Sequence, residues 1–323
     1  MTQGNLLDDA VERVALSEHA GLSGAPLERV RLADGRVLIV KRFTPETDIT
    51  LAATGGEVGW EHVLWQSGAL EKLPIGVNHA IVDTWVENDE TVIVMRDLGT
   101  AMLTWENRLD AARCRWLVEH VGRLHRHFLG HPPEGLAPLD AVLALFAPER
   151  IKDQAHVELF ELALRGWEIF ESTVPVDVAE PVLGLLEDID PLTTALQARP
   201  ITLIHGDLAV VNMAVELDDL VLIDWAMPTA APGALDITRF LAGCWSVVDL
   251  TREELLAVYE KAAGPAYDET AMRLALLASL TWLGWNKALD AAEHPDPGIR
   301  AREQADLDWW VTEARKTLES GAI

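Results

Sequence analysis

Short apolar runs separated by turn residues dominate the first hundred positions of the chain. Runs at 25–32 and 36–43 flank Asp34-Gly35, and an earlier run begins near Val14. Asp-Gly between two alternating runs is a strong β-hairpin signal. The pattern predicts three antiparallel strands, and the apolar run at 91–99 predicts one more strand.

Helical spacing of apolar residues appears first at 55–70, where Leu73-Pro74 ends the pattern. From about residue 105 long amphipathic stretches take over, and they continue to the end of the chain. The length also exceeds the size at which a single hydrophobic core usually stops growing. We therefore expect two lobes: a β-rich N-lobe with one helix at 1–96, and a larger, mainly helical C-lobe at 97–323.

The helical part is interrupted once by two short β-branched runs, Ile201–Ile204 and Leu220–Ile223. Polar residues follow each run directly. The pattern therefore predicts two short strands whose following loops carry candidate functional side chains.

The charge and the cysteine content exclude several classes of function. The 323 residues carry 26 Lys and Arg against 52 Asp and Glu, a formal net charge of −26. Nucleic acids and anionic membranes bind basic surfaces, so neither is an expected partner. Two cysteines are too few for a disulfide scaffold or a CxxC metal site.

No segment predicts export or membrane insertion. The most apolar stretch, 274–285, has 12 residues, too few to span a bilayer, and fits a buried helix. The acidic N-terminal segment lacks the basic and then apolar pattern of a signal peptide. We expect a cytoplasmic protein with no obligate protein partner.

Three polar residues lie on the loops after the two short strands. Asp207 and Asn212 stand five positions apart in the segment 205–212, and Asp224 ends the next apolar run. Phosphoryl transfer uses such a set, because one carboxylate must accept a hydroxyl proton while a second carboxylate and a carbonyl oxygen hold Mg²⁺. The context favours phosphotransfer chemistry, although each residue alone is weak evidence.

Lys41 supplies the cation that binding a triphosphate requires. It lies within the apolar run 37–43, where alternation leaves open whether the side chain faces solvent or the interior. Upstream, Ser23 and Gly24 belong to a glycine-containing hairpin loop whose backbone amides could cover phosphates.

These residues, in this order, resemble the protein-kinase-like phosphotransferases of the aminoglycoside phosphotransferase and choline kinase family. The resemblance covers nearly the whole chain. It implies an α+β, two-lobed protein-kinase-like fold, with ATP and Mg²⁺ held between a small antiparallel N-lobe and a helical C-lobe that carries the acceptor site.

The resemblance also assigns roles to single positions. It implies that Lys41 binds the phosphates and pairs with a glutamate of the following helix. Glu57 and Glu61 both qualify, since they lie four apart on one predicted helical face; Glu61 fits the family's helix register better. The remaining positions are the catalytic Asp207, the metal ligands Asn212 and Asp224, the adenine-binding hinge at Val94, Met95 and Arg96, and the structural residues His205 and Asp236.

Two departures from the family pattern are visible in the sequence. Ala209 stands where the family often has a second histidine, and Trp225-Ala226 follows Asp224 where protein kinases have Phe-Gly. Neither departure removes a catalytic or metal-binding residue. The first weakens assignment to a particular subfamily.

The acceptor site must come from the late helices. Trp faces next to carboxylates can stack on a sugar ring and bind hydroxyl or ammonium groups. The spacing of the tryptophans also fits an ordinary helical core, and this interpretation is the favoured one. The candidate substrate residues are Trp282, Trp285, Asn286, Asp290 and Trp309.

The sequence thus predicts an ATP- and Mg²⁺-dependent kinase for a small-molecule hydroxyl, such as that of a sugar, an amino sugar or an aminoglycoside-like compound. The alternatives are a kinase for a choline-like amino alcohol and a nucleotide-binding pseudo-kinase or scaffold without turnover. None of Lys41, Asp207 and Asp224 is lost, which favours an active enzyme.

Overall fold

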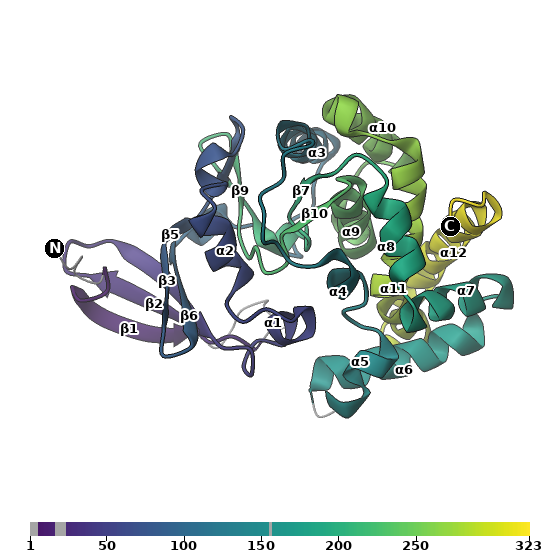
Figure 1. The fold of residues 1–323 in the computed structure, drawn as a ribbon, viewed down its shortest axis with the longest axis horizontal. Coiled ribbons are helices and arrows are strands. Elements are labelled where there is room, and N and C mark those ends of the chain that lie inside the picture. Colours follow the sequence, from purple (N-terminus) through teal and green to yellow (C-terminus); the bar gives the residue numbers. More distant parts are fainter. Residues whose placement is uncertain (1–5, 17–23, 155–156) are drawn as a thin grey trace.

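The computed structural model describes residues 6–16, 24–154 and 157–323. Figure 1 shows a β-rich N-terminal region at one end and a helical C-terminal region at the other. This is the α+β arrangement expected from the sequence. The described strands are β1 (Ala10–Leu16), β2 (Leu27–Leu32), β3 (Val37–Phe43), β4 (Val77–His79), β5 (Ile81–Glu87), β6 (Glu90–Arg96), β7 (Thr202–Ile204), β8 (Met213–Glu216), β9 (Asp219–Leu222) and β10 (Thr229–Ala231).

The N-terminal sheet has five strands in the order β1-β2-β3-β6-β5, with antiparallel neighbours throughout. The second and third early strands and the later strand expected from the sequence are confirmed as β2, β3 and β6. The first, expected from Val14, overlaps the end of β1, and the part of that run at 17–23 lies outside the described residues. The turn between β2 and β3 falls at Asp34-Gly35, where Gly35 has a φ of +89°. The fifth strand, β5, was not expected; Asn88 and Asp89, with φ values of +52° and +66°, turn it tightly back into β6.

The helix expected over 55–70 is present but shorter, as α2 (Trp60–Gln66). The expectation of a single helix in this region was wrong, because a second short helix, α1 (Ile49–Thr54), precedes α2. Asp48 caps the start of α1 by accepting a hydrogen bond from the Leu51 amide, and Gly55 ends it in the left-handed conformation at φ +71°. A glycine-rich connection at 55–59 therefore separates the two helices, so that helix α2 begins only at Trp60.

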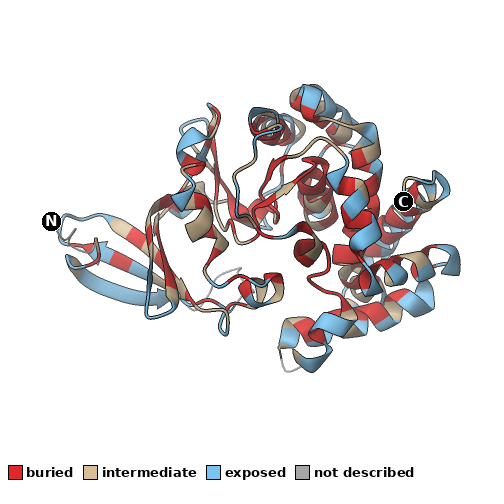
Figure 2. Ribbon diagram, viewed as in Figure 1, coloured by how far each residue is buried: buried red, intermediate tan, exposed pale blue. Residues whose placement is uncertain are grey.

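The C-terminal helices enclose the main hydrophobic core, and Figure 2 shows their buried positions facing inward while β1 is largely exposed. The apolar stretch at 274–285 forms the buried middle of α11, as expected. The helices are α3 (Ala111–His127), α4 (Leu139–Leu143), α5 (Pro148–Ile151), α6 (Glu158–Thr173), α7 (Val176–Glu187), α8 (Asp190–Gln197), α9 (Ala234–Cys244), α10 (Arg252–Ala263), α11 (Glu269–Glu293) and α12 (Pro297–Glu319).

The structure has two further small sheets, and the one that contains β4 joins the N-terminal and C-terminal regions. The two expected strands are present as β7 and β9; β7 pairs with β10, while β9 lies between β8 and β4. Because β4 precedes residue 96 but pairs in parallel with β9, the chain crosses between the two regions before the N-terminal sheet is complete. No helix among the described residues combines the length and the apolarity that crossing a membrane requires.

Candidate active site

Lys41 lies on β3, the middle strand of the five-stranded sheet, and its side chain is buried rather than solvent-facing. Its Nζ atom donates hydrogen bonds to Glu61 Oε1 and to Asp224 Oδ1, both at 2.9 Å. Asp224 is 183 residues away in sequence. The fold therefore brings the strand lysine directly to one of the predicted metal-binding residues.

The charges around Lys41 keep it protonated. Burial alone would lower the pKa of the ammonium group, but the carboxylates of Asp224 and Glu61 outweigh that effect and raise the pKa above its ordinary value. Burial also raises the pKa of Glu61, while the nearby Lys41 ammonium opposes that rise. Lys41 thus remains cationic between two carboxylates, and a cation is what binding an anionic phosphate requires.

Glu61 reaches Lys41 because the start of α2 is pinned to the sheet. The amide of Gly59, the N-cap residue, donates to Thr91 Oγ1 on β6 at 2.9 Å. A Cβ atom at Gly59 would lie 2.5 Å from Phe43, so only glycine permits this close packing. The prediction that Glu57 and Glu61 share one helical face was wrong. Glu57 lies in the connection before α2 and is exposed.

The loop after β7 carries Asp207 and Asn212. Gly206 has a φ of +87°, and a Cβ atom there would lie 1.9 Å from the Met227 carbonyl oxygen, so the sharp turn before Asp207 requires glycine. His205 Nε2 donates to the Ile223 carbonyl at 2.9 Å, and the Ile223 amide donates to the Asn212 carbonyl at 3.0 Å. These bonds tie the Asp207 loop to the residue that precedes Asp224.

Asp236, in the first turn of α9, braces the same loop from beneath. Its carboxylate accepts hydrogen bonds from the amides of His205 at 2.8 Å and Gly206 at 2.9 Å. His125 Nε2 on α3 lies 3.1 Å from the same carboxylate, and its Nδ1 lies 3.0 Å from the Tyr259 hydroxyl. Burial opposes ionisation of Asp236, but the hydrogen bond and charge of His125 lower the pKa below its ordinary value.

Asp207 has two side-chain neighbours. The side-chain nitrogen Nδ2 of Asn212 donates to the backbone carbonyl oxygen of Asp207 at 2.9 Å and to Asp207 Oδ2 at 3.2 Å. Arg239 Nη2 on α9 lies 2.6 Å from Asp207 Oδ1. Sequence reasoning missed both Arg239 and His125. Arg239 lies one helical turn after Asp236, so the i,i+3 spacing was the available signal for Arg239.

Asn212 and Asp224 fit a magnesium site by their chemistry. The side-chain nitrogen of Asn212 is hydrogen-bonded to Asp207. The side-chain oxygen Oδ1 of Asn212 is therefore the atom suited to binding a cation. Asp224 has a φ of +58°, a strained conformation typical of functional sites. No cluster of three or more His, Cys, Asp or Glu among the described residues could hold a metal. A two-residue donor set suits Mg²⁺, which completes its shell with phosphates and water.

Of the other predicted nucleotide-binding residues, the described ones lie just before β2 or at the end of β6. Ser23 is outside the described residues; Gly24 has a φ of +88°, and a Cβ atom there would lie 2.9 Å from the Thr47 carbonyl oxygen. The predicted hinge residues belong to the end of β6, where Val94 is buried and Met95 is half-buried. Arg96 Nη1 lies 2.5 Å from Glu216 Oε2, which links β6 to β8.

The candidate substrate residues divide into core and pocket positions. Trp285 is buried with its ring 5.3 Å from that of Phe146, and Trp282 is buried beneath Arg239, with the guanidinium carbon 5.3 Å from its ring. Asn286 and Asp290 instead line a pocket. The core interpretation therefore applies to Trp282 and Trp285 but not to the two polar residues.

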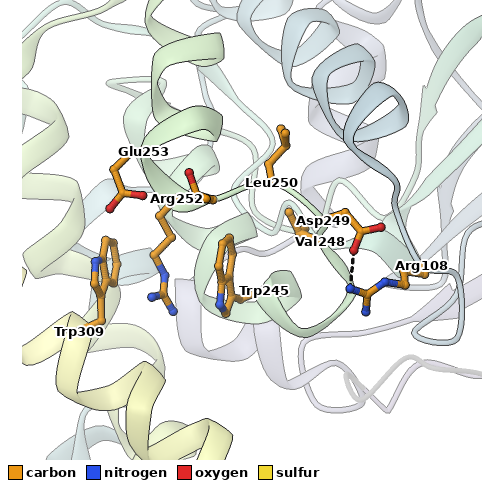
Figure 3. Close-up of a pocket in the computed structure, with 9 residues that line it drawn as sticks. Arg108, Trp245, Val248, Asp249, Leu250, Arg252, Glu253 and Trp309 are labelled. Atoms are coloured by element: carbon orange, nitrogen blue, oxygen red, sulfur yellow. Dashed lines mark ion pairs between the residues drawn. The ribbon is translucent and has the colours of Figure 1, made fainter.

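Two adjoining pockets share Trp245. The first, of about 330 Å³, includes Trp309; Figure 3 shows Arg252 between two indoles, with its guanidinium carbon 4.4 Å from the Trp245 ring and 4.2 Å from the Trp309 ring. The second, of about 170 Å³, is named here the polar pocket. Its lining residues are Ala242, Gly243, Trp245, Ser246, Asn286, Lys287, Asp290, Arg302, Glu303 and Asp306.

Comparisons with solved structures identify similar folds. An aminoglycoside phosphotransferase from Streptomyces rimosus, solved with ADP and streptomycin, has a TM-score of 0.51 and 18% identity, over 81% of this chain and 94% of that one. Choline kinase LicA from Streptococcus pneumoniae has a TM-score of 0.51 and 12% identity, over 97% and 94%. An amicoumacin kinase, solved with AMP-PNP and Ca²⁺, has a TM-score of 0.51 and 15% identity, over 94% and 88%.

Sequence comparison assigns the family. No curated protein sequence matches the chain. The sequence model of the phosphotransferase enzyme family matches residues 23–274, well over half of the chain. The resemblance drawn from the motifs and the kinase-like fold are therefore confirmed. The chain belongs to the phosphotransferase enzyme family.

Proposed function

We propose that this enzyme transfers the γ-phosphoryl group of ATP to a hydroxyl group of a polar small molecule, in a reaction that needs Mg²⁺. One observation carries the proposal: Lys41 on β3 forms a direct ion pair with Asp224, 183 residues away in the sequence. The residue before Asp224, Ile223, is hydrogen-bonded to Asn212, which in turn contacts Asp207.

In the proposed reaction, Asp207 accepts the proton of the acceptor hydroxyl. A bond forms between the acceptor oxygen and the γ-phosphorus, the bond from that phosphorus to the β,γ-bridging oxygen breaks, and ADP leaves. Lys41 binds the phosphates, and Glu61 orients Lys41. Asn212 and Asp224 would hold Mg²⁺, which supplies positive charge to the phosphate oxygens when bound.

The same proposal assigns the two regions. Residues 1–96 form the nucleotide-binding lobe, with Gly24 and the β6 end at Val94, Met95 and Arg96 next to the nucleotide, and residues 97–323 form the catalytic and acceptor lobe. Similar folds solved with ADP or AMP-PNP support nucleotide binding. The acceptor would be a hydroxylated molecule such as a sugar or an amino sugar.

The proposed setting is the cytoplasm, without a nucleic acid, membrane or obligate protein partner. Cys114 and Cys244 are both free, buried thiols, which fits a reducing compartment. The net charge of −26 disfavours binding to polyanions.

The test is release of ADP from Mg-ATP across a panel of sugars, amino sugars, sugar acids, aminoglycosides and amino alcohols. Asp207→Asn should lower acceptor-dependent release by about 10²–10⁴-fold, because it removes the proton acceptor. Asp218→Asn, a change at an exposed turn position of φ +70°, is the matched control and should leave the rate unchanged. Nucleotide binding without any turnover would instead support the pseudo-kinase alternative.

A further inference from the structure

The two carboxylate oxygens of Asp207, the proposed base, have different surroundings. Oδ1 is buried and lies 2.6 Å from Nη2 of Arg239 in an ion pair. The Asp207 side chain as a whole is 27% exposed. Because Oδ1 is covered, Oδ2 is the carboxylate oxygen that an acceptor hydroxyl can reach.

Oδ2 keeps the capacity to take a proton. Asn212 Nδ2 donates to it at 3.2 Å, and the same nitrogen also donates to the backbone carbonyl oxygen of Asp207 at 2.9 Å. A carboxylate oxygen has two lone pairs, so one donor leaves room for a second hydrogen bond from an acceptor hydroxyl. One oxygen of Asp207 is therefore held by a cation, and the other is open.

The guanidinium group of Arg239 is directed at this one carboxylate. Among the residues that the structure describes, Asp207 is the only carboxylate that forms an ion pair with it. The Nε and Nη1 atoms of Arg239 are buried without a hydrogen-bond partner. Buried unpaired donors cost free energy, so polar contacts in the interior do not explain why an arginine is present here. Its one ion pair, with the proposed base, indicates a role in the reaction.

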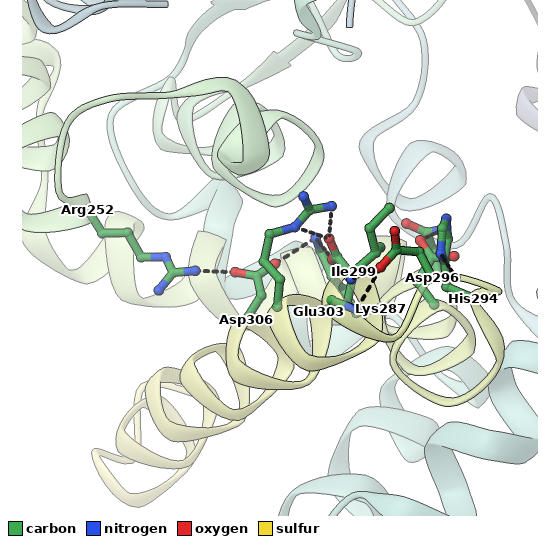
Figure 4. Close-up of polar contacts among 11 residues, drawn as sticks. Arg252, Lys287, His294, Asp296, Ile299, Glu303 and Asp306 are labelled. Carbon is green, nitrogen blue, oxygen red and sulfur yellow. Dashed lines mark hydrogen bonds and ion pairs between the residues drawn. The ribbon is translucent and has the colours of Figure 1, made fainter. Parts of the chain in front are cut away.

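The other buried cations of the C-terminal helices belong to a separate network. Lys287 Nζ lies 2.9 Å from Glu303 and 2.6 Å from Asp306, and Arg252 also pairs with Asp306 (Figure 4). This network joins α10, α11 and α12 to one another. Within the described part of the chain, Arg239 has no ion pair with it, so the charge of Arg239 is not needed to balance these carboxylates.

Two neighbours fix the place of the guanidinium group. Its carbon atom lies 5.3 Å from the ring of Trp282 on α11, a cation–π contact. A Cβ atom at Gly243 would lie 2.2 Å from Nη1, so the group can occupy its place only because residue 243 is glycine. Gly243 and Arg239 both belong to α9, which therefore supplies the cation and the space for it.

We propose that Arg239 is a positioning residue: by pairing with Oδ1 it fixes the rotation of the Asp207 carboxyl group and leaves Oδ2 to accept the proton of the acceptor hydroxyl. This inference rests on the proposed function. Rotation about the bond to a carboxyl group is otherwise only weakly restricted. In the transfer the acceptor O–H bond breaks, its proton goes to Oδ2, and its oxygen bonds to the γ-phosphorus as ADP leaves.

The experiment uses the acceptor of the panel above that gives the fastest ADP release, with two variants of Arg239. Arg239→Met should lower kcat by about 10–10²-fold, because a misplacement of about 1 Å is costly to a reacting group. KM for ATP and for the acceptor should stay within about threefold, because binding contacts are kept. Arg239→Lys keeps the charge and should recover part of the loss. Arg273→Gln, at an exposed position of α11, is the control and should behave like the wild type.

Gly243→Ala tests position without removing the charge. The added methyl group must displace the guanidinium, while alanine is the better residue for a helix. The variant should therefore lower kcat in the same way as Arg239→Met without lowering the melting temperature. A purely structural role of Arg239 would not produce this combination.

A double-mutant cycle tests whether Arg239 acts through Asp207. In the Asp207→Asn background, Arg239→Met should change the remaining rate by less than about twofold, because no base is left to position. Urea denaturation of the same four proteins gives a readout that needs no turnover. The losses of stability should not add, because each single change breaks the same ion pair.

The results separate this inference from the proposed function. The inference alone is overturned if Asp207→Asn abolishes turnover while Arg239→Met leaves kcat unchanged, if Arg239→Met raises only a KM, or if the effects add in either cycle. Both are overturned if the wild type releases no ADP with any acceptor, or if Asp207→Asn is as active as the wild type.

Discussion

Lys41 Nζ and Glu61 Oε1 lie 2.9 Å apart inside the protein, with 7% and 4% of their side chains exposed. The pair joins the centre of the N-terminal sheet to the first turn of α2. Because removing one member of a buried ion pair leaves the other charge uncompensated, the position of α2 and the position of the lysine depend on each other.

Glu61→Gln should raise KM for ATP by about tenfold and lower kcat, since the change removes a charge-assisted hydrogen bond that orients Lys41. Steady-state kinetics with varied ATP will measure this. Glu57→Gln is the matched control and should behave like the wild type, because Glu57 is exposed and precedes the helix. Equal effects of the two changes would contradict the assignment of Glu61.

Gly206→Ala should abolish most activity and lower the melting temperature. The added Cβ would lie 1.9 Å from the Met227 carbonyl oxygen, at a φ of +87° that alanine disfavours. Gly184→Ala provides the contrast, since nothing lies within 4 Å of a Cβ there and the position is an exposed helix interior. That change should stabilise the protein by about 0.5–1 kcal/mol, as measured by chemical denaturation.

The Asp236 interactions should weaken in acid. The pKa of Asp236 is lowered in the folded protein, so its contribution to stability is present above the unfolded value, near 3.9, and is lost as the pH falls through the lower folded value. Wild type and Asp236→Asn should therefore differ most in free energy of unfolding above about pH 5, and the difference should shrink below about pH 4. Urea denaturation of both proteins at a series of pH values from above 5 to below 4 will measure this difference in free energy of unfolding. A difference that widens on acidification would count against this account.

Lys287→Met should lower the free energy of unfolding by about 3–5 kcal/mol, the usual consequence of removing one partner from a buried ion pair. Only 9% of the Lys287 side chain is exposed, and it neutralises both Glu303 and Asp306. Lys316→Met removes a surface ion pair and should leave stability unchanged within error. If Lys287→Met were equally harmless, the network would not contribute to stability.

Local sequence signals accounted for much of the N-terminal sheet and of the loop chemistry. Asp34-Gly35 predicts its hairpin because the turn type depends on two adjacent residues. Gly206 and Asp207 are recognisable for a similar reason, since the sharp turn and the carboxylate are encoded within one short motif. The helix expected over 55–70 is shorter in the structure, because side-chain periodicity does not register the glycines that end α1 and precede α2.

The sequence by itself determined the α+β class and the family, and it supplied the residues proposed for phosphoryl transfer, because each is carried by short-range patterns in a set order. Only the tertiary structure decided that Glu61 rather than Glu57 meets Lys41, and that Arg239 lies against Asp207. These contacts depend on where a helix begins and on how α9 packs below the catalytic loop. Side-chain packing between elements that are distant in sequence sets both contacts, and a local pattern can at most make a residue a candidate for them.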